Sequence, residues 1–238
     1  MNSFDLAILH FLNSFAQSRP AFDLLVVRVM EDGLTAGAVV VALFWAAWET
    51  EGKGDREKEE ILLFGLFASI FSVLVARALA LTLPFRARPL HNPEIHFHLP
   101  NAVEPSRLIN WSSFPSDHAT LFFCLATILW MVSRRLGIIA ALYALVVIDL
   151  PRVYTGIHYP TDIIAGSLLG FAIACGARVP QLRSAIANPA LRWKESYPTF
   201  FHFCFFLWAF EVGELFSTVR DFAYYALHVS GLESLLRR

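Results

Sequence analysis

The run ILLFGLFASIFSVLVARALALTL, from Ile61 to Leu83, decides the fold class of this 238-residue chain. The run is longer than the ~20 residues that a helix needs to cross the hydrocarbon of a bilayer. Its only charged side chain is Arg77. We therefore expect residues 61–83 to form a membrane-spanning helix. Because an ionisable group at membrane depth is costly, Arg77 is also a candidate functional residue.

The composition extends this expectation to the whole chain. Hydrophobic residues make up 56% of the sequence and charged residues only 16%, whereas soluble domains carry about 25% charged residues. The mean hydropathy is +0.53. We predict an all-α polytopic membrane bundle with about six spans, and a single domain over residues 1–238 because no repeat or long linker interrupts it. The further apolar runs lie at 33–48, 119–133, 136–150, 163–177 and 199–217.

The N-terminal stretch from Phe4 to Phe15 is amphipathic rather than uniformly apolar, since Asp5, His10 and Asn13 lie among its hydrophobic residues. This pattern is typical of a helix that lies in the membrane interface. The net charge of −1 provides no basic field that would favour a nucleic acid. Membrane lipids are therefore the expected partners, and the sequence predicts no oligomeric state.

The positive-inside rule orients the predicted spans. Three loops of the same parity carry basic residues and are expected in the cytoplasm, so residues 84–117 and 152–161 should lie outside. The basic residues of the three loops are Lys53, Arg56 and Lys58, then Arg134 and Arg135, then Arg178, Arg183, Arg192 and Lys194. Arginines also occur in the outer loops, where binding an anion would explain them: Arg86, Arg88, Arg107 and Arg152.

Three polar clusters occupy the outer ends of the predicted spans. They are Arg77 with Arg86-Ala87-Arg88-Pro89, then Phe114-Pro115-Ser116-Asp117-His118-Ala119, then Arg152 with His158-Tyr159-Pro160-Thr161-Asp162. Parity places all three clusters on the same side of the membrane. Side chains from each cluster can therefore belong to one site.

The chemistry of these clusters suits a phosphate group. Guanidinium groups bind phosphate oxygens in bidentate fashion and neutralise charge in the transition state. The segments at Pro115 and Pro160 have the pattern of helix starts, whose free backbone N–H groups bind anions. One histidine can attack phosphorus while the other protonates the leaving oxygen. Asp162 lies four residues after His158, where it can accept a hydrogen bond from one ring nitrogen and leave the other free.

In this order, the elements Arg-Pro, Pro-Ser-x-His and Arg-x5-His-x3-Asp resemble the three signature motifs of the type 2 phosphatidic acid phosphatase (PAP2) superfamily. The resemblance covers roughly residues 61–178, the expected catalytic core. It implies a helical phosphatase that uses no metal ion or other cofactor and forms a phosphohistidine intermediate. The roles that it implies are His158 as nucleophile, Asp162 as its orienting partner, His118 as general acid, and Arg88, Ser116, Asp117 (through its backbone N–H) and Arg152 as phosphate-binding residues.

Three positions depart from the family pattern. The lysine that usually stands seven residues before Arg88 is Leu81, so we expect Arg77 or Arg86 to supply the missing phosphate-binding cation. The serine that usually precedes the arginine of the third motif is a proline here. The glycine of the second motif is Asp117, which resembles the undecaprenyl-diphosphatase branch and favours an isoprenoid diphosphate as substrate.

We expect a membrane lipid phosphatase that hydrolyses a lipid phosphate or diphosphate. It should reside in a bacterial inner membrane with its site on the extracytoplasmic face. The alternatives are a phosphatidate or phosphatidylglycerophosphate phosphatase, a metal-dependent hydrolase that uses the loop residues His91, His96 and His98, and a multispan anion transporter. A transporter would need polar residues near the middle of its spans, whereas here they gather at one end.

Overall fold

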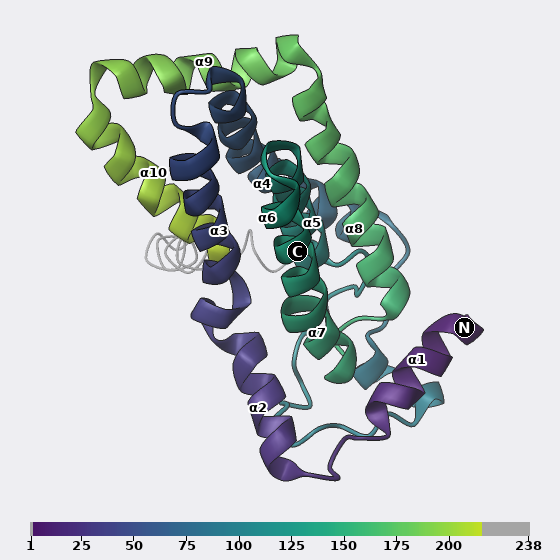
Figure 1. The fold of residues 1–238 in the computed structure, drawn as a ribbon. Helices are drawn as coiled ribbons and strands as arrows, with labels where there is room; N and C mark the ends of the chain where they lie inside the picture. The colour runs from purple at the N-terminus through teal and green to yellow at the C-terminus, as the bar shows by residue number, and fades with distance from the viewer. Residues whose placement is uncertain (1, 216–238) are drawn as a thin grey trace, which may run out of the picture.

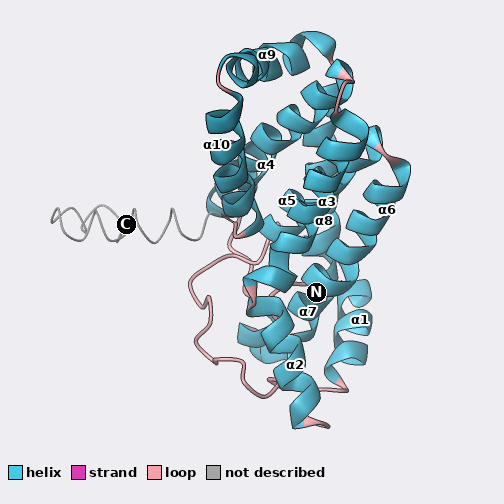
Figure 2. Cartoon of the chain, turned by 60° about the vertical axis from the view of Figure 1, so that its left-hand side comes forward, coloured by secondary structure: helices cyan, strands magenta, loops and turns pink. Residues whose placement is uncertain are grey.

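Helices account for all the regular structure of residues 2–215, the part of the chain that this computed structural model describes (Figures 1 and 2). Three described helical stretches are long and apolar enough to cross a membrane, namely Arg56–Thr82, Arg134–Tyr154 and Pro160–Arg178. A fourth, Asp117–Val132, is apolar but shorter. The prediction of an all-α membrane bundle is therefore confirmed.

The α-helices follow the apolar runs of the sequence, with short turns of other helix types at several joints. Their bounds are α1 Ser3–Asn13, α2 Pro20–Glu31, α3 Val39–Ala47, α4 Arg56–Thr82, α5 Asp117–Val132, α6 Arg134–Tyr143, α7 Leu150–Tyr154, α8 Pro160–Ala174, α9 Pro180–Ser196 and α10 Pro198–Gly213. The π-helical turns η1 (Leu34–Ala38) and η2 (Trp48–Gly52) extend α3 at both ends, and η5 (Ala144–Asp149) joins α6 to α7. The 3₁₀ turns are η3 Pro89–His91, η4 Pro93–Ile95 and η6 Cys175–Arg178.

Helix α5 lies at the centre of the bundle and packs against α4, α6 and α8. Its contact with α8 is close because two glycines of α8 face it. A Cβ atom at Gly170 would lie 2.2 Å from the Thr120 carbonyl oxygen, and one at Gly166 would lie 2.5 Å from the Ser116 carbonyl oxygen. The two helices run parallel in this contact, so their N-termini, which carry the second and third sequence motifs, lie at the same end of the bundle.

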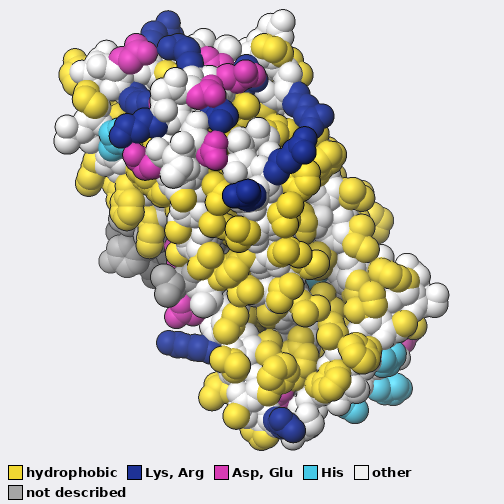
Figure 3. Space-filling view, viewed as in Figure 1, with side chains coloured by type: hydrophobic (Ala, Val, Ile, Leu, Met, Phe, Trp, Pro, Cys, Tyr) yellow, Lys and Arg dark blue, Asp and Glu magenta, His cyan; other side chains and the backbone are white. Residues whose placement is uncertain are grey.

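Helix α9 runs across the other end of the bundle (Figure 1). Residues 178–194 are predicted to form a cytoplasmic loop, and the structure shows a helix instead. One side of this helix is buried through Ala187 and Leu191, while Lys194 forms an ion pair with Glu59 at the start of α4 (2.5 Å). Figure 3 shows charged side chains gathered at this end, above a broad hydrophobic surface.

Helix α2 was not predicted, because Asp23 and Arg28 interrupt its apolar residues. In the structure Asp23 is fully buried. Its carboxylate accepts hydrogen bonds from the backbone and side-chain nitrogens of Asn101, both at 2.8 Å, and from the hydroxyl of Tyr154. These bonds fasten the loop between α4 and α5 to both α2 and α7.

The two ends of the described chain agree with the helices expected there. In α1, Asp5, Leu9 and Asn13 are buried while Phe4 and Phe11 are exposed, so two of its three polar residues face the bundle. Helix α10 occupies most of the last predicted span and packs along α3, α4 and α9. The end of that span beyond residue 215 and the tail to residue 238 lie outside the described residues.

Candidate active site

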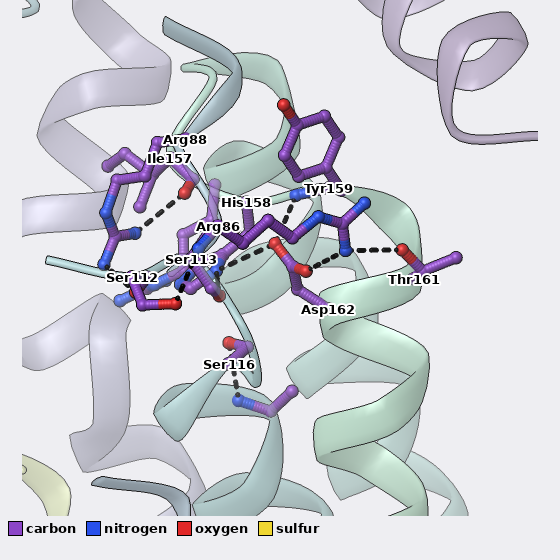
Figure 4. Close-up of polar contacts among 12 residues, drawn as sticks. Arg86, Arg88, Ser112, Ser113, Ser116, Ile157, His158, Tyr159, Thr161 and Asp162 are labelled. Atoms are coloured by element: carbon purple, nitrogen blue, oxygen red, sulfur yellow. Dashed lines mark hydrogen bonds and ion pairs between the residues drawn. The ribbon is translucent and has the colours of Figure 1, made fainter. Parts of the chain in front are cut away.

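A cavity of about 600 Å³ is surrounded by the end of α4, the loop that follows it, the start of α5, residues 152–158 and the ends of α2 and α10. Three residues predicted for the site, Arg86, Ser116 and Asp162, lie beside this cavity rather than in its wall (Figure 4). The other predicted residues line it, so that all three sequence motifs converge on one space. These lining residues are Arg77, Arg88, Asp117, His118, Arg152 and His158.

His158 lies between α7 and α8, with 4% of its surface exposed. Its Nδ1 atom is 2.8 Å from the backbone carbonyl oxygen of Ser113. Because a carbonyl can only accept, Nδ1 carries the proton and Nε2 carries the lone pair. The sequence assigned this orienting role to Asp162, but Oδ2 of Asp162 is 3.6 Å from Nδ1, which is too long for a hydrogen bond. The Ser113 carbonyl therefore sets the tautomer of His158.

Asp162 instead organises the first turn of α8. It is fully buried, and its Oδ2 accepts a hydrogen bond from the backbone N–H of Tyr159 at 2.8 Å. This bond satisfies one of the free amides at the helix start. Its backbone carbonyl accepts the N–H of Ser116 at 3.2 Å, which links the starts of α8 and α5. Asp162 thus holds the segment that carries His158 without a hydrogen bond to its ring.

Arg86 belongs to a buried ion-pair network and not to the cavity. Its guanidinium lies 2.8 Å from Oδ2 of the fully buried Asp5 and 2.5 Å from Oδ1 of Asp162. It also donates to the hydroxyl of Thr161 at 2.9 Å and stacks 4.0 Å from the ring centroid of Tyr159. With two carboxylates as partners, Arg86 fastens α1 to the start of α8 and does not line the cavity.

Arg88 and Arg152 are the deep cations of the cavity, with 6% and 5% of their surfaces exposed. The guanidinium of Arg88 donates hydrogen bonds to the backbone carbonyls of Trp111 (3.1 Å), Ser112 (3.2 Å) and Ile157 (2.7 Å). Burial lowers the pKa of Arg88 to about 10, so the residue still carries its positive charge at neutral pH. These contacts fix a cation beside the histidines.

The first turn of α5 presents His118 to the cavity. The buried hydroxyl of Ser116 accepts the N–H of Ala119 at 3.3 Å and caps the helix. The sequence analysis gave Asp117 a role through its backbone, and the structure adds one for its side chain. The Asp117 carboxylate lies 2.9 Å from Nδ1 of His118 and 2.6 Å from a guanidinium nitrogen of Arg77. One carboxylate therefore joins the second motif to the end of α4.

Arg77 is the cation that stands near the position of the missing family lysine. Its guanidinium lies over the ring of Trp111, 5.4 Å from the centroid, and the residue lines the cavity together with Ala76 and Ala80. Leu81, at the lysine position itself, is 79% exposed and lies outside the cavity wall. Of the two arginines that the sequence left open, the structure therefore favours Arg77.

Arg107 was expected only as an outer-loop arginine that an anion would explain, and the cavity wall also contains Glu31 and Glu214, which lie outside the three motifs. Arg107 lines the cavity and forms an ion pair with Glu31, at the end of α2. The only signal for Arg107 was a basic residue in a loop predicted to lie outside. His91, one of the loop histidines considered as metal ligands, instead lies with Nε2 2.8 Å from the Arg107 carbonyl oxygen. Between residues 2 and 215, no cluster of three or more His, Cys, Asp or Glu side chains could hold a metal ion.

A family model described as the PAP2 superfamily matches residues 60–185. This range is more than half of the 238-residue chain. It includes all three motifs and both cavity histidines, and it agrees with the core expected over residues 61–178.

Curated relatives match over shorter or longer stretches. The chain is 39% identical over 59 residues to the bacitracin transport permease protein BcrC of Bacillus licheniformis, a match that covers 25% of this chain and 29% of that protein. It is 26% identical over 174 residues to lipid A 1-diphosphate synthase of Escherichia coli, covering 69% and 70%. It is 36% identical over 74 residues to undecaprenyl-diphosphatase of Sulfolobus acidocaldarius, covering 29% and 36%. The first and third matches thus span about a third of the relative.

Proposed function

We propose that this chain, which belongs to the PAP2 superfamily and is a lipid phosphatase of that family, hydrolyses an isoprenoid diphosphate through a phosphohistidine on His158. One observation carries the proposal. Both motif histidines line the same cavity as the buried cations Arg88 and Arg152. A nucleophile, a proton donor and fixed positive charge are the groups that phosphoryl transfer to a histidine requires.

In the first step, Nε2 of His158 attacks the terminal phosphorus while the bond from phosphorus to the oxygen of the leaving lipid phosphate breaks. The lone pair is on Nε2 because Nδ1–H donates to the Ser113 carbonyl. His118, held by Asp117 at 2.9 Å, gives its proton to the leaving oxygen. Arg88 neutralises the charge that develops on the transferring oxygens.

In the second step, a water molecule attacks the phosphorus and His118 takes up its proton. The phosphorus–nitrogen bond breaks, so inorganic phosphate leaves and His158 regains its lone pair. No metal ion has a part in either step, because the arginines supply the positive charge.

Two observations favour a diphosphate over other lipid phosphates. The second motif has Asp117 in place of glycine, and this aspartate pairs with both Arg77 and His118. The Sulfolobus relative is named undecaprenyl-diphosphatase, although the match covers 36% of it. Below the charged end, the face of the bundle seen in Figure 3 is largely hydrophobic, which suits a substrate with a long apolar chain. We place the site on the extracytoplasmic face from the distribution of basic residues.

The name of the Escherichia coli relative, a lipid A 1-diphosphate synthase that matches 69% of this chain, supports a second candidate reaction. In that reaction a lipid phosphate, rather than water, takes the phosphoryl group from His158. The first step and its residues would be the same. The products differ, because hydrolysis releases inorganic phosphate and transfer yields a new lipid diphosphate.

Purified protein in detergent, assayed against a panel of lipid phosphates and diphosphates with and without EDTA, tests the proposal. We expect inorganic phosphate from an isoprenoid diphosphate, at an unchanged rate in EDTA. If none of the lipids is hydrolysed, the proposal is wrong. Activity that is lost in EDTA and restored by Mg²⁺ or Zn²⁺ would refute the metal-free mechanism. A labelled lipid diphosphate formed only when a second lipid phosphate is added would favour the transferase reaction.

A further inference from the structure

Arg107 is a cation of the cavity wall that none of the three motifs includes. It lies in the loop between α4 and α5, and its guanidinium pairs with Glu31 at the end of α2. Both partners line the cavity, with 31% and 43% of their side chains exposed. An ion pair between partly exposed groups adds little stability. A phosphate with more charge than one carboxylate can therefore displace Glu31 from Arg107.

The arginines of the cavity wall form a buried inner pair and a partly exposed outer pair. Arg88 and Arg152 are almost fully buried, whereas 31% of each side chain of Arg77 and Arg107 is exposed. The outer pair differ in their partners, because Arg77 is held by Asp117 next to His118 and Arg107 is held by Glu31 at the end of α2. Burial lowers the pKa of Arg88, the carboxylates of Asp117 and Asp162 oppose this shift, and the positive charges of Arg77 and Arg107 add to it. All these cations therefore share one electrostatic environment that an anion would relieve.

The residues next to Arg107 are apolar and indicate the path of a lipid chain that leaves the cavity. Leu108 and Trp111 also line the cavity and are 39% and 49% exposed. Together with the exposed Ile109, they place apolar side chains beside the cavity on the same loop as Arg107. A lipid chain leaving the cavity over these residues would bring its own phosphate past Arg107.

We infer that Arg107 binds the phosphate to which the lipid chain is attached and so makes the site selective for a lipid diphosphate over a lipid monophosphate. The inference rests on the proposed function. The terminal phosphate lies between Arg88, Arg152 and His158. The lipid-bearing phosphate replaces Glu31 as the partner of Arg107. When His158 attacks the terminal phosphorus, the breaking bond leaves its electron pair on the oxygen of the lipid-bearing phosphate. Arg107 neutralises that added charge, and a lipid monophosphate, whose leaving group is an alcohol, receives nothing from it.

The test compares kcat/KM for the diphosphate and the monophosphate of one isoprenoid alcohol in the same detergent. Arg107→Ala should reduce kcat/KM for the diphosphate by about 10- to 100-fold more than for the monophosphate, the scale for losing a hydrogen bond between charged groups. Arg107→Lys keeps the charge but not the two-pronged guanidinium, so its loss of selectivity should be intermediate. Arg28→Ala, which removes an exposed arginine of α2 outside the cavity wall, should leave the ratio unchanged.

Glu31→Gln provides the opposite change. It frees Arg107 from its carboxylate, so KM for the diphosphate should fall several-fold while KM for the monophosphate changes less. Equal losses on both substrates in folded Arg107→Ala and Arg107→Lys would overturn the inference and leave the proposed function intact. A wild-type protein that hydrolyses neither substrate would overturn the proposed function and with it this inference.

Discussion

The tautomer of His158 is set by a backbone carbonyl, that of Ser113, at 2.8 Å, and this arrangement makes the role of His158 as nucleophile testable. His158→Ala should abolish turnover of every substrate, because the phosphorus–nitrogen bond of the proposed intermediate forms at Nε2 of His158. Rapid quenching with a phosphorus-labelled substrate should trap an acid-labile, base-stable phosphohistidine in the wild type. Label that remains on the His158→Ala protein would show that another residue is the nucleophile.

The contribution of His118 to kcat should be larger for a poorer leaving group. Its Nδ1 contacts Asp117 and the residue lines the cavity, so it is placed to protonate the leaving oxygen. General acid catalysis contributes about 10²- to 10⁴-fold, and a leaving group that is already stable as an anion does not need it. His118→Ala should therefore reduce kcat for a lipid phosphate by that factor, and kcat for a nitrophenyl phosphate much less. Equal losses on the two substrates would contradict the assignment of His118 as the acid.

Arg77, rather than Arg86, should act in catalysis. Arg77→Ala should lower kcat by about 10²-fold, the usual scale for losing one transition-state donor. Arg86→Ala should mainly lower thermal stability, because Arg86 pairs with the buried Asp5 and Asp162. The measurement is kcat for each folded variant together with its apparent Tm in detergent. Near-normal turnover in Arg77→Ala, with the loss confined to Arg86→Ala, would reverse the assignment.

At this scale the sequence predicted residue types better than contacts. The motif spacing predicted that His118, His158 and Arg88 share one site, and they line one cavity. The prediction was possible because the sequence states the type of each side chain. It could not predict the contact of His158 with Ser113, since a backbone carbonyl is the same at every residue. The partnership of Arg107 with Glu31 was equally hidden, because the two residues come from separate elements.

Helix α1 has a structural role that its amphipathic pattern did not indicate. Its buried Asp5 accepts hydrogen bonds from Arg86 (2.8 Å), from the backbone N–H of Thr161 (2.9 Å) and from the hydroxyl of Thr161 (2.7 Å). These bonds join α1 to the first turn of α8, which follows His158 directly. The helix therefore supports the active site even though it lies outside the matched family range of 60–185.

Asp5→Asn should weaken this support. The variant removes the negative charge between Arg86 and Thr161, at a cost of roughly 2 kcal/mol in the free energy of unfolding, the scale for a hydrogen bond to a charged group. Thermal unfolding in detergent should show a lower apparent Tm. The control is His10→Ala, at an exposed position of the same helix, which should leave Tm unchanged. If both variants unfold like the wild type, α1 is not held by Asp5.

The helices themselves were predictable where their apolar residues are uninterrupted, as in α4, α5 and α8. Helix α9 was missed because its charged residues resemble a loop, and only the structure shows that they pair with α4, as Lys194 does with Glu59. Helix α2 was missed because Asp23 breaks its apolar run. The buried hydrogen bonds that make Asp23 tolerable come from a distant loop, and local sequence carries no signal for them.

The whole molecule has two chemically different ends. Basic and acidic residues gather around α9 (Figure 3), while the cavity opens at the end where α5 and α8 begin. Arg88 and Arg86, at the cavity end, are engaged by carbonyls and carboxylates, so they are not free charges of the kind that keep a loop in the cytoplasm. From the positive-inside rule we therefore propose that α9 lies in the cytoplasm and that the cavity lies outside.

This orientation can be tested with two matched serine-to-cysteine variants in a protein whose native Cys124, Cys175 and Cys204 have been replaced. Ser106, in the loop beside the cavity, and Ser196, at the end of α9, are both exposed. In intact cells a membrane-impermeant maleimide should label Ser106→Cys and should label Ser196→Cys only after the membrane is permeabilised. Serine and cysteine have similar size and neither variant removes a charge, so the substitutions leave the orienting signal unchanged. The reverse labelling pattern would place the cavity in the cytoplasm, and the substrate would then have to come from the inner leaflet.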